Sequence, residues 1–273
     1  MERLSLTKKE FMLFQDFIYQ HIGISLGEQK IYLVQARLAK RVKQLGLESF
    51  SEYYNTLLND KTGTELEYLC SLISTNVTSF FRESKQWEFW KANLNTMLEG
   101  KNRRLRIWSA ACSTGEEPYS IAMFLDENLP NAASFDIKIL ATDVSPRVLK
   151  EATRGLYGPK AIANLNQSYL NRYFERYDSN GSYAIKDAMK KNITFRGFNL
   201  VTGNYEIFKQ IQFDIIFCRN VMIYFDKPTQ QTLVDKFFKM LSPGGFLFIG
   251  SSEALTDARK GLKSRSASIY QKV

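Results

Sequence analysis

The stretch Leu105–Ser120, which reads LRIWSAACSTGEEPYS, decides the fold prediction. It begins as a short apolar strand and turns through small residues. It then reaches Glu116-Glu117-Pro118, where a helix can start because proline suits a first helical turn. A strand, a small-residue turn and a helix form the ligand-facing corner of a doubly wound sheet, since small side chains let a ligand approach the backbone. The pattern also fits an ordinary turn whose acids suit the helix dipole.

This turn differs from a dinucleotide-binding loop. It holds Gly115 alone, where the dinucleotide fingerprint has three glycines. The two carboxylates at the predicted helix start would repel a pyrophosphate, whereas they suit a cationic amino or sulfonium group. The corner therefore favours S-adenosylmethionine over NAD as the ligand.

Beyond this corner, strand-like runs alternate with helical segments, which indicates a mostly parallel sheet with right-handed crossovers. The expected strands are Leu105–Trp108, Ile137–Ala141, Ile193–Phe195, Phe213–Cys218 and Phe246–Gly250. The expected helices between them are Tyr119–Asn128, Pro146–Ala152 and Thr229–Leu241. Ligands bind at the carboxyl ends of such strands, so Asp143 is a candidate to hold ribose hydroxyls. Its alternative role is to cap the helix that begins at Ser145-Pro146.

The first part of the chain, residues 1–75, has the pattern of an all-helical domain. Apolar residues recur at helical spacing, and capping boxes begin at Thr7, Ser49 and Thr64. Residues 76–104 are expected to form a linker and a connecting helix, and residues 105–273 the α/β domain.

One of these helices, over residues 29–45, carries a cluster of positive charge without any acid. Arg37, Lys40 and Arg41 fall beside one another at 3.6 residues per turn. A solvated surface is the usual explanation of such a face, and docking of an acidic partner is the alternative that its single sign of charge suggests.

An inserted antiparallel unit is predicted at residues 167–191. There Ser179-Asn180-Gly181 separates the runs Arg172–Tyr177 and Tyr183–Lys186, and Asn-Gly between such runs is a strong hairpin signal. The unit is either a structural flap or an edge that pairs with a partner peptide.

Composition restricts the class of protein further. The 273 residues are 44% hydrophobic, enough for a sizeable core, and the net charge of +9 favours an anionic partner. No run reaches the ~20 apolar residues of a membrane span, and the start lacks a signal-peptide core, so a cytoplasmic protein is expected. The cysteines are few and dispersed, which argues against a disulfide framework or a zinc site: Cys70, Cys112 and Cys218.

Several long stretches of the sequence match a known family and occur in the same order as in that family. The sequence resembles the bacterial chemotaxis receptor methyltransferases, the CheR family of protein-glutamate O-methyltransferases, over nearly its whole length. The matching stretches are TNVTSFFRE (Thr75–Glu83), IWSAACSTGEEPYSIAM (Ile107–Met123), ATDVS (Ala141–Ser145), ITFRGFNL (Ile193–Leu200), FDIIFCRNVMIYFD (Phe213–Asp226) and GGFLFIGSSEAL (Gly244–Leu255).

The resemblance implies an all-helical N-terminal domain before a doubly wound, Rossmann-like methyltransferase domain with a small inserted antiparallel β-subdomain. The implied cofactor is S-adenosylmethionine, and the product is S-adenosylhomocysteine. Asn76, Thr78 and Arg82 would contact the methionine end of this cofactor, and Asp143 would hold its ribose.

The glycine-poor loop would face the same methionine end. Glu117 is the implied carboxylate there, in preference to Glu116. Either Ala110 or Ala111 would contact the cofactor beside it, and the sequence does not decide between the two.

The resemblance also assigns the residues after the third and fourth strands. Asn199 and Leu200 would frame the adenine, while Arg219, Asn220 and Tyr224 would line the mouth where the methyl group is presented. Arg219 and Asn220 are also implied cofactor contacts.

The partner implied by the family is the cytoplasmic domain of membrane chemotaxis receptors. The family holds the receptor with a basic helix of the N-terminal domain, and Arg37, Lys40 and Arg41 resemble that helix. A monomer would fit a protein that visits many receptors, and whether the hairpin grips a receptor tail stays open.

The chemistry agrees with the absence of a Ser-His-Asp set. A glutamate side chain has a pKa of about 4.3, so at neutral pH it is already a nucleophile and needs no general base. Arg219 is expected to orient this carboxylate. Tyr224 is expected to attract the sulfonium, with a core position as its alternative.

Two other functions remain open. One is a methyltransferase with a different acceptor. A nucleic-acid acceptor is disfavoured, because the segment Asn220–Tyr224 lacks the Pro-Pro-aromatic run that amino-methylating DNA enzymes use. The other is a non-catalytic scaffold of receptor arrays that binds S-adenosylmethionine.

Overall fold

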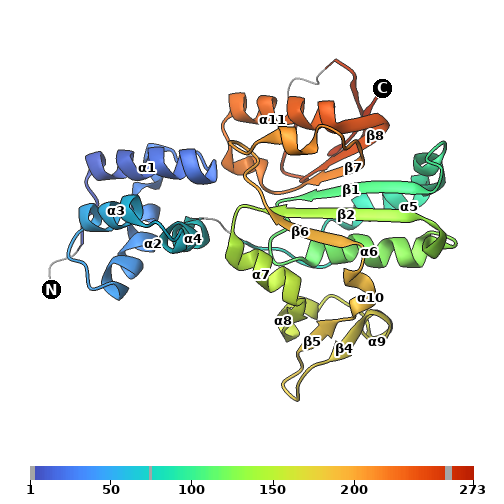
Figure 1. The fold of residues 1–273 in the computed structure, drawn as a ribbon, viewed down its shortest axis with the longest axis horizontal. Helices are drawn as coiled ribbons and strands as arrows, with labels where there is room; N and C mark the ends of the chain where they lie inside the picture. The colour runs from blue at the N-terminus through green and yellow to red at the C-terminus, as the bar shows by residue number, and fades with distance from the viewer. Residues whose placement is uncertain (1–3, 74–75, 256–259) are drawn as a thin grey trace.

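A computed structural model describes residues 4–73, 76–255 and 260–273 of the chain as a helical domain beside an α/β domain (Figure 1). The helical domain consists of α1 (Lys8–Ile22), η1 (Glu28–Lys30), α2 (Ile31–Gln44), α3 (Phe50–Asn59) and α4 (Thr64–Ile73). Its helices bury one common apolar core, in which Phe14, Leu38 and Tyr53 are fully buried.

The capping boxes predicted for this domain form to different extents. At α1 the box is complete, because the Thr7 hydroxyl accepts the Glu10 N–H and the Glu10 carboxylate accepts the Thr7 N–H. At α3, Ser49 accepts the Glu52 N–H, but the Glu52 carboxylate binds an earlier backbone N–H.

The third predicted box was wrong. Thr64 is the first residue of α4 rather than its cap. The carboxylate of Asp60 instead accepts the N–H of Glu65, at 2.7 Å from oxygen to nitrogen. An acid four residues before the helix thus replaces the expected hydroxyl as the acceptor at this helix start.

The α/β domain is built on a seven-stranded sheet in the order β6-β2-β1-β7-β8-β10-β9. The strands are β1 (Arg104–Ala110), β2 (Asp136–Asp143), β6 (Ile193–Gly197), β7 (Phe213–Cys218), β8 (Leu241–Ile249), β9 (Leu262–Ser266) and β10 (Ile269–Lys272). The first five in spatial order are parallel, and β10 runs antiparallel to both neighbours. The doubly wound fold is thereby confirmed.

Helices cover the sheet unequally. On one face, α5 (Ser84–Leu98) and α6 (Glu116–Asn128) pack Trp90 and Phe124 against Ile107 and Phe217. On the other face, α11 (Lys227–Met240) packs Phe237 into a second core. The helix α7 (Pro146–Arg154) follows β2, and the short turns η2 (Ala132–Ser134), η3 (Tyr205–Phe208) and η4 (Met222–Tyr224) complete the connections.

A small second sheet confirms the predicted insertion and enlarges it. The strands β4 (Phe174–Arg176) and β5 (Tyr183–Ile185) form the hairpin around Asn180-Gly181. A third strand, β3 (Leu156–Tyr157), pairs with the other edge of β5. The remaining elements of this β-subdomain are α8 (Pro159–Ile162), α9 (Gln167–Tyr173) and α10 (Asp187–Lys190). The unit therefore begins earlier than residue 167.

The strand β8 begins at Leu241, five residues before the predicted start at Phe246. Phe213 of β7 lies opposite Leu241, but two residues later Ile215 lies opposite Phe246. The residues between Leu241 and Phe246 bulge out, with Gly244 in the left-handed region at φ +74°.

Over the described ranges, no helix has both the length and the apolarity needed to cross a bilayer.

Candidate active site

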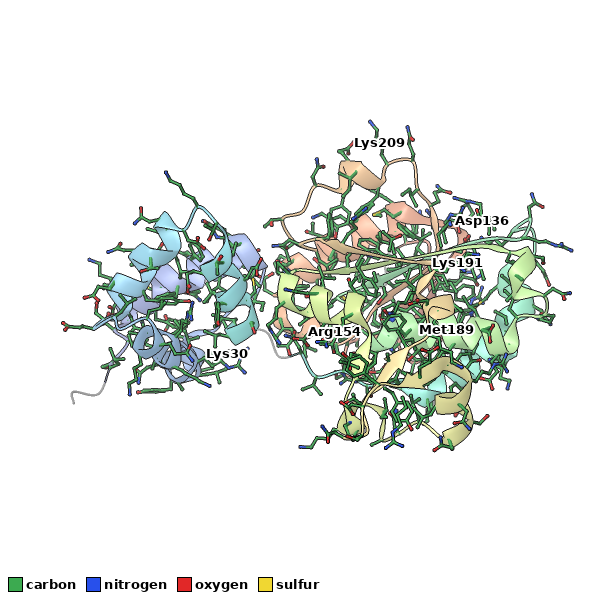
Figure 2. The ribbon with its side chains drawn as sticks, turned by 60° about the horizontal axis from the view of Figure 1, so that its bottom comes forward. Lys30, Asp136, Arg154, Met189, Lys191 and Lys209 are labelled. Carbon is green, nitrogen blue, oxygen red and sulfur yellow. The ribbon has the colours of Figure 1, made fainter. Side chains whose placement is uncertain are left out.

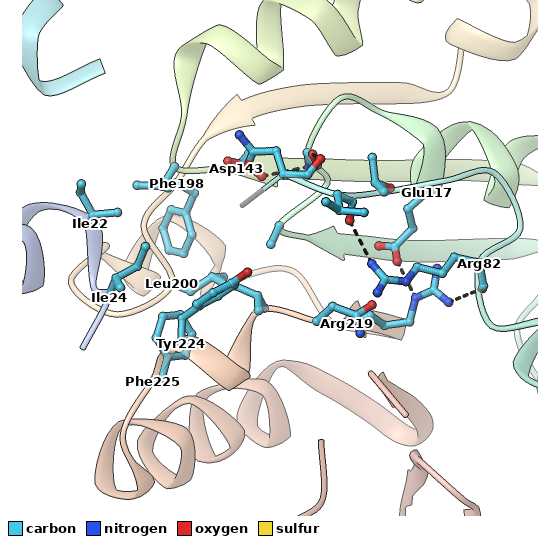
Figure 3. Close-up of a pocket in the computed structure, with 18 residues that line it drawn as sticks. Ile22, Ile24, Arg82, Glu117, Asp143, Phe198, Leu200, Arg219, Tyr224 and Phe225 are labelled. Atoms are coloured by element: carbon cyan, nitrogen blue, oxygen red, sulfur yellow. Dashed lines mark hydrogen bonds and ion pairs between the residues drawn. The ribbon is translucent and has the colours of Figure 1, made fainter. Parts of the chain in front are cut away.

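A pocket lies at the carboxyl ends of β1, β2 and β7, where the strand order reverses, and the helical domain closes its far side (Figure 3). This is the ligand-binding position of a doubly wound sheet. The pocket encloses about 880 Å³ of space, including its mouth. The predicted site residues that line it are Asn76, Thr78, Arg82, Ala111, Glu117, Asp143, Leu200, Arg219, Asn220 and Tyr224.

The floor of the pocket is the loop that connects β1 to α6. Ala111 and Ser113 both have positive φ, at 75° and 49°, which is unusual for residues with a side chain. The loop holds this shape because the N–H groups of Ala111 and Cys112 both donate to the carbonyl of Thr142, at 2.8 Å each. Of the two alanines left open by the sequence, Ala111 lines the pocket, whereas Ala110 is fully buried behind it.

Gly115 ends this loop in a place where only glycine fits. Its φ is +97°, and a Cβ atom would lie 2.9 Å from both the Cβ of Ala152 and the hydroxyl oxygen of Tyr157. The lone glycine of the turn therefore serves packing against α7 and β3, while small side chains line the pocket.

Asp143 lies at the end of β2 with 8% of its surface exposed. Its carboxylate accepts the N–H groups of Ser113 and Ser145, at 2.9 and 3.0 Å. Burial raises the pKa of this carboxyl above the usual value for aspartate, although the two N–H donors oppose the shift. Ser145 occupies the N-cap position of α7, but its hydroxyl makes no capping bond.

A buried ion pair forms the opposite wall. Nε of Arg219 lies 2.6 Å from a carboxylate oxygen of Glu117, whose other oxygen accepts the hydroxyl of Ser109. Nη1 of Arg219 donates to the backbone carbonyl of Arg82 at 2.7 Å and to Gln86 at 3.3 Å. The Arg219 side chain is only 3% exposed. It therefore holds protein groups in place, and its expected role of orienting an acceptor stays a prediction.

Arg82 supplies a second cation next to this pair (Figure 3). Its guanidinium donates to the carbonyl of Val77 at 2.9 Å. Across the described part of the chain, no carboxylate lies within ion-pair distance of it. Arg82 is half-buried, so its positive charge is available to an anionic group in the pocket.

The neighbouring acid Glu116 faces elsewhere. Its carboxylate accepts the hydroxyl of Thr114, and burial raises its pKa. It does not line the pocket. The resemblance favoured Glu117 over Glu116 as the carboxylate near the cofactor, and of the two only Glu117 lines the pocket.

Two further acids fix the segment after β7. Glu253 accepts the N–H groups of Asn220 and Ile223, at 3.0 and 3.3 Å. Glu83 accepts the side-chain N–H of Asn220 at 3.4 Å and the backbone N–H of Ser251, which follows β8, at 3.0 Å. Asn220 itself has φ +58°, so this segment is held in a turn that most residues avoid. Neither acid was given a role from the sequence, because both act by tertiary contacts.

The other end of the pocket is apolar. Phe198, Leu200 and Tyr224 face Ile22 and Ile24, which come from the helical domain (Figure 3). These isoleucines were not predicted, because no local pattern in the sequence marks a contact between domains. The lining residues that were not predicted are Ile22, Ile24, Val77, Ser113, Val144, Phe198, Val221 and Phe225.

Asn199 lies behind the pocket wall rather than in it. Its side-chain nitrogen donates to the carbonyl of His21 at 2.8 Å, and its oxygen accepts the N–H of Val201 at 2.8 Å. It therefore joins the helical domain to the loop after β6.

In the part of the chain that is described, no group of three or more His, Cys, Asp or Glu side chains is arranged to hold a metal ion.

Comparison with known proteins agrees with this architecture. Residues 9–74 match the family described as CheR methyltransferase, all-alpha domain. Residues 76–270 match the CheR methyltransferase, SAM binding domain. The chain belongs to the CheR methyltransferase family. Its cofactor is therefore S-adenosylmethionine.

Relatives extend over almost the whole chain. The chemotaxis protein methyltransferase of Borreliella burgdorferi is 38% identical, covering 98% of this chain and 96% of the relative. That of Escherichia coli is 36% identical, covering 98% and 92%. Chemotaxis protein methyltransferase 2 of Vibrio cholerae is 36% identical, covering 94% and 89%.

In this CheR-family chain, two of the three predicted docking residues have internal partners. Arg37 donates to the carbonyls of Leu72 and Ile73, at 3.0 and 2.6 Å, near the end of α4. Arg41 forms an ion pair with Glu65. Both arginines thus fix α2 against α4, as well as contributing positive charge.

Lys40 is the member of the set that faces solvent. It is exposed, and no ion-pair partner lies near it among residues 4–73, 76–255 and 260–273. Two large apolar side chains of the same helix are also exposed, Tyr32 at 78% and Leu33 at 45%. The outer face of α2 is therefore both basic and partly apolar.

Proposed function

We propose that this protein transfers a methyl group from S-adenosylmethionine to the side-chain carboxylate of glutamates in chemotaxis receptors. The products are a glutamate methyl ester and S-adenosylhomocysteine. Family membership supports the methyl transfer, and the relatives are named for chemotaxis. The choice of glutamate rests on the chemistry of the pocket.

The pocket offers what this cofactor requires. Asp143 is a buried acceptor for ribose hydroxyls, Arg82 is a cation for the methionine carboxylate, and Phe198 and Leu200 are apolar surfaces for the adenine. When bound there, the cofactor supplies a methyl group on a sulfonium, which is a good leaving group.

The observation that carries the glutamate assignment is the absence of a base on the pocket wall. Among the described lining residues the titratable acids are Glu117 and Asp143, and both accept hydrogen bonds from the protein. An acceptor that carries a proton, such as an amine or a hydroxyl, would need one of them to remove it. A carboxylate acceptor needs no such step, because it is ionised at neutral pH.

The chain's own residues then position and shield the reactants. The Arg219–Glu117 pair holds the linker carbonyl of Arg82 and so fixes one wall. The Tyr224 ring lines the pocket beside the isoleucines of the helical domain, where it excludes water and attracts a cation. Attack by a carboxylate on a sulfonium methyl group neutralises two charges, so a dry site favours it.

The receptor would be held by α2. Lys40 and the exposed Tyr32 on this helix suit an acidic helical surface that carries apolar side chains, and Arg37 and Arg41 fix the helix. On this proposal the protein acts in the cytoplasm on the receptors' cytoplasmic domains.

The test uses methyl-labelled S-adenosylmethionine and receptor-containing membranes from the protein's own source. After the reaction, the membranes are treated with mild base. Label on protein that is released as methanol supports carboxyl methyl esters. Label that survives base, or that resides in nucleic acid, contradicts the glutamate assignment. Tight cofactor binding without any transfer would instead favour a scaffold.

A further inference from the structure

One face of the sheet is left without a helix over β2, β6 and the first half of β1, whereas Trp108 farther along β1 packs against Phe237 of α11. Alternate residues of these strands point to opposite faces. Leu105, Ile107 and Ile139 point into the core beneath α5 and α6. The intervening residues Arg106 and Lys138 point the other way, and no helix is drawn in front of the three strands in Figure 1.

This open side, which we term the basic face, consists of Arg104, Arg106, Lys138, Thr194 and Arg196. These residues line a hollow that encloses about 1070 Å³, open to solvent. The strand register makes Arg106 and Lys138 direct neighbours, although like charges opposite each other are unfavourable. Such a concentration of like charge lowers the stability of the free sheet.

The positive charge is only partly neutralised within the protein. Arg106 forms an ion pair with Asp136. For Arg104, Lys138 and Arg196, no hydrogen-bond or ion-pair partner of the side chain lies among the residues that the structure describes. Figure 2 shows Asp136 at the start of β2 and Lys209 projecting from the segment after η3.

An apolar rim borders the same hollow. Ile207 and Ile211 line it with 63% and 36% of their surface exposed, next to the buried Phe208 and Phe213. Exposed aliphatic side chains beside a cluster of cations are the composition of a protein-binding surface rather than of a merely solvated one.

We propose that the basic face binds an acidic, extended segment of a partner protein, with carboxylates on the cations and an apolar side chain against Ile207 and Ile211. From Arg104 to Arg196 the register spans roughly 20 Å along the strands and about 10 Å across them. An extended segment of about six or seven residues covers that distance.

The composition of the face favours a peptide over other anions. Single-stranded nucleic acid is bound by aromatic side chains that stack on bases, whereas the exposed apolar residues here are isoleucines. A lipid surface is met by projecting apolar residues, whereas this site is hollowed. The basic face is also separate from α2, and the hollow that it lines shares one residue, Phe198, with the pocket at the ends of the strands.

The test measures binding of a fluorescein-labelled octapeptide of alternating Glu and Leu to the full chain by fluorescence anisotropy. The double variant Lys138→Glu/Arg196→Glu should bind it about tenfold more weakly or worse, because reversed charges repel the carboxylates. The matched control is Lys91→Glu/Lys263→Glu, which changes the net charge equally at exposed positions elsewhere. The control should keep the wild-type affinity.

Three further measurements complete the design. A Gln-Leu octapeptide should not bind, and hydrogen exchange with the acidic peptide should show protection in β6 and around η3. S-Adenosylmethionine affinity should be unchanged in both double variants, since their residues do not line the pocket. The proposal is overturned by equal weakening in both double variants, by an oligonucleotide that binds more tightly than the peptide, or by no saturable binding to the wild type.

Discussion

At the scale of single residues, Asp143 sets how the pocket responds to pH. An ionised carboxylate accepts hydrogen bonds from ribose hydroxyls, and a protonated one loses acceptors. Burial raises the pKa of this carboxyl, so protonation begins at a higher pH than for an exposed aspartate. We therefore expect S-adenosylmethionine affinity, measured by calorimetry, to fall as the pH is lowered through this pKa.

The control is Asp143→Asn, which retains the size of the side chain. It should bind the cofactor about 10-fold to 100-fold more weakly at neutral pH, since each lost charge-assisted bond is worth about 1.5–3 kcal/mol. Its affinity should show little dependence on pH in the acidic range. An unchanged affinity, or the same pH profile as the wild type, would contradict the ribose assignment.

We expect alanine substitutions of Arg82 and Arg219 to have different effects, one on cofactor binding and the other on stability. Arg219→Ala leaves Glu117 buried without its partner, which should lower the free energy of unfolding by about 3–5 kcal/mol. Arg82→Ala should change stability by less than about 1 kcal/mol, because no carboxylate pairs with it in the described residues. It should instead weaken cofactor binding. Urea unfolding and calorimetry on both variants separate the two roles, and equal stabilities would refute the assignment.

These residues also show how far the site could be predicted from sequence. Asp143 was identifiable because it directly follows an apolar strand, and parallel strands end at one edge. The resemblance identified Arg219, but not that Glu117 would engage it, since that contact depends on how β7 and α6 pack. Glu253 and Ile24 had no local signal at all, because they act across loops and domains.

At the scale of elements, the loop between β1 and α6 depends on Gly115. Gly115→Ala should cost about 2–4 kcal/mol, because it combines a positive φ with close contacts to Ala152 and Tyr157. The matched control is Gly46→Ala, which has φ +69° but no atom within 4 Å of the added Cβ. It should cost about 1 kcal/mol.

Thermal and urea unfolding of the two glycine variants provide the comparison. Gly115→Ala should also weaken cofactor binding, because it displaces the loop that carries Ser113. Gly46→Ala should bind the cofactor normally. Equal losses of stability in both variants would mean that backbone conformation alone, and not crowding, makes Gly115 necessary.

Other elements mark the limit of pattern-based prediction. The five parallel strands were predicted because each contains an apolar run, although only β7 is buried along its whole length. β9 was not predicted, since only Leu262 of its residues is buried and the others are polar. It is a strand because it pairs with β10, whose own residues pack against β8. Such an edge strand depends on its neighbours more than on its composition.

At the scale of the whole molecule, the junction between the domains forms part of the pocket. Asn199 bonds to His21, the N–H of Ser25 donates to the carbonyl of Tyr224, and Tyr19 contacts Thr229. We expect Asn199→Ala to weaken cofactor binding several-fold although its side chain does not line the pocket. The loss of the bond to His21 frees the segment that carries Ile22 and Ile24.

Hydrogen exchange and calorimetry test this prediction. In Asn199→Ala, the amides of residues 21–25 should exchange faster, while those of β1 and β7 stay unchanged. A Thr232→Ala variant is a suitable control, since its hydroxyl donates to the carbonyl of Pro228 within α11. Normal exchange at residues 21–25 combined with weaker binding would instead indicate a direct contact of Asn199 with the cofactor.

If the cofactor occupies the pocket as proposed, the isoleucines at the end of α1, Ile22 and Ile24, give the helical domain a share in its binding free energy. Whatever shifts this segment changes the apolar wall of the chamber, and hence the affinity for the nucleoside that rests on it. Thermodynamic linkage then requires the reverse effect by the same factor. Occupancy of the chamber alters the affinity of the helical domain for any ligand that moves α1. On the proposed function, binding of the cofactor and binding of a target by the helical domain would therefore report on the same equilibrium.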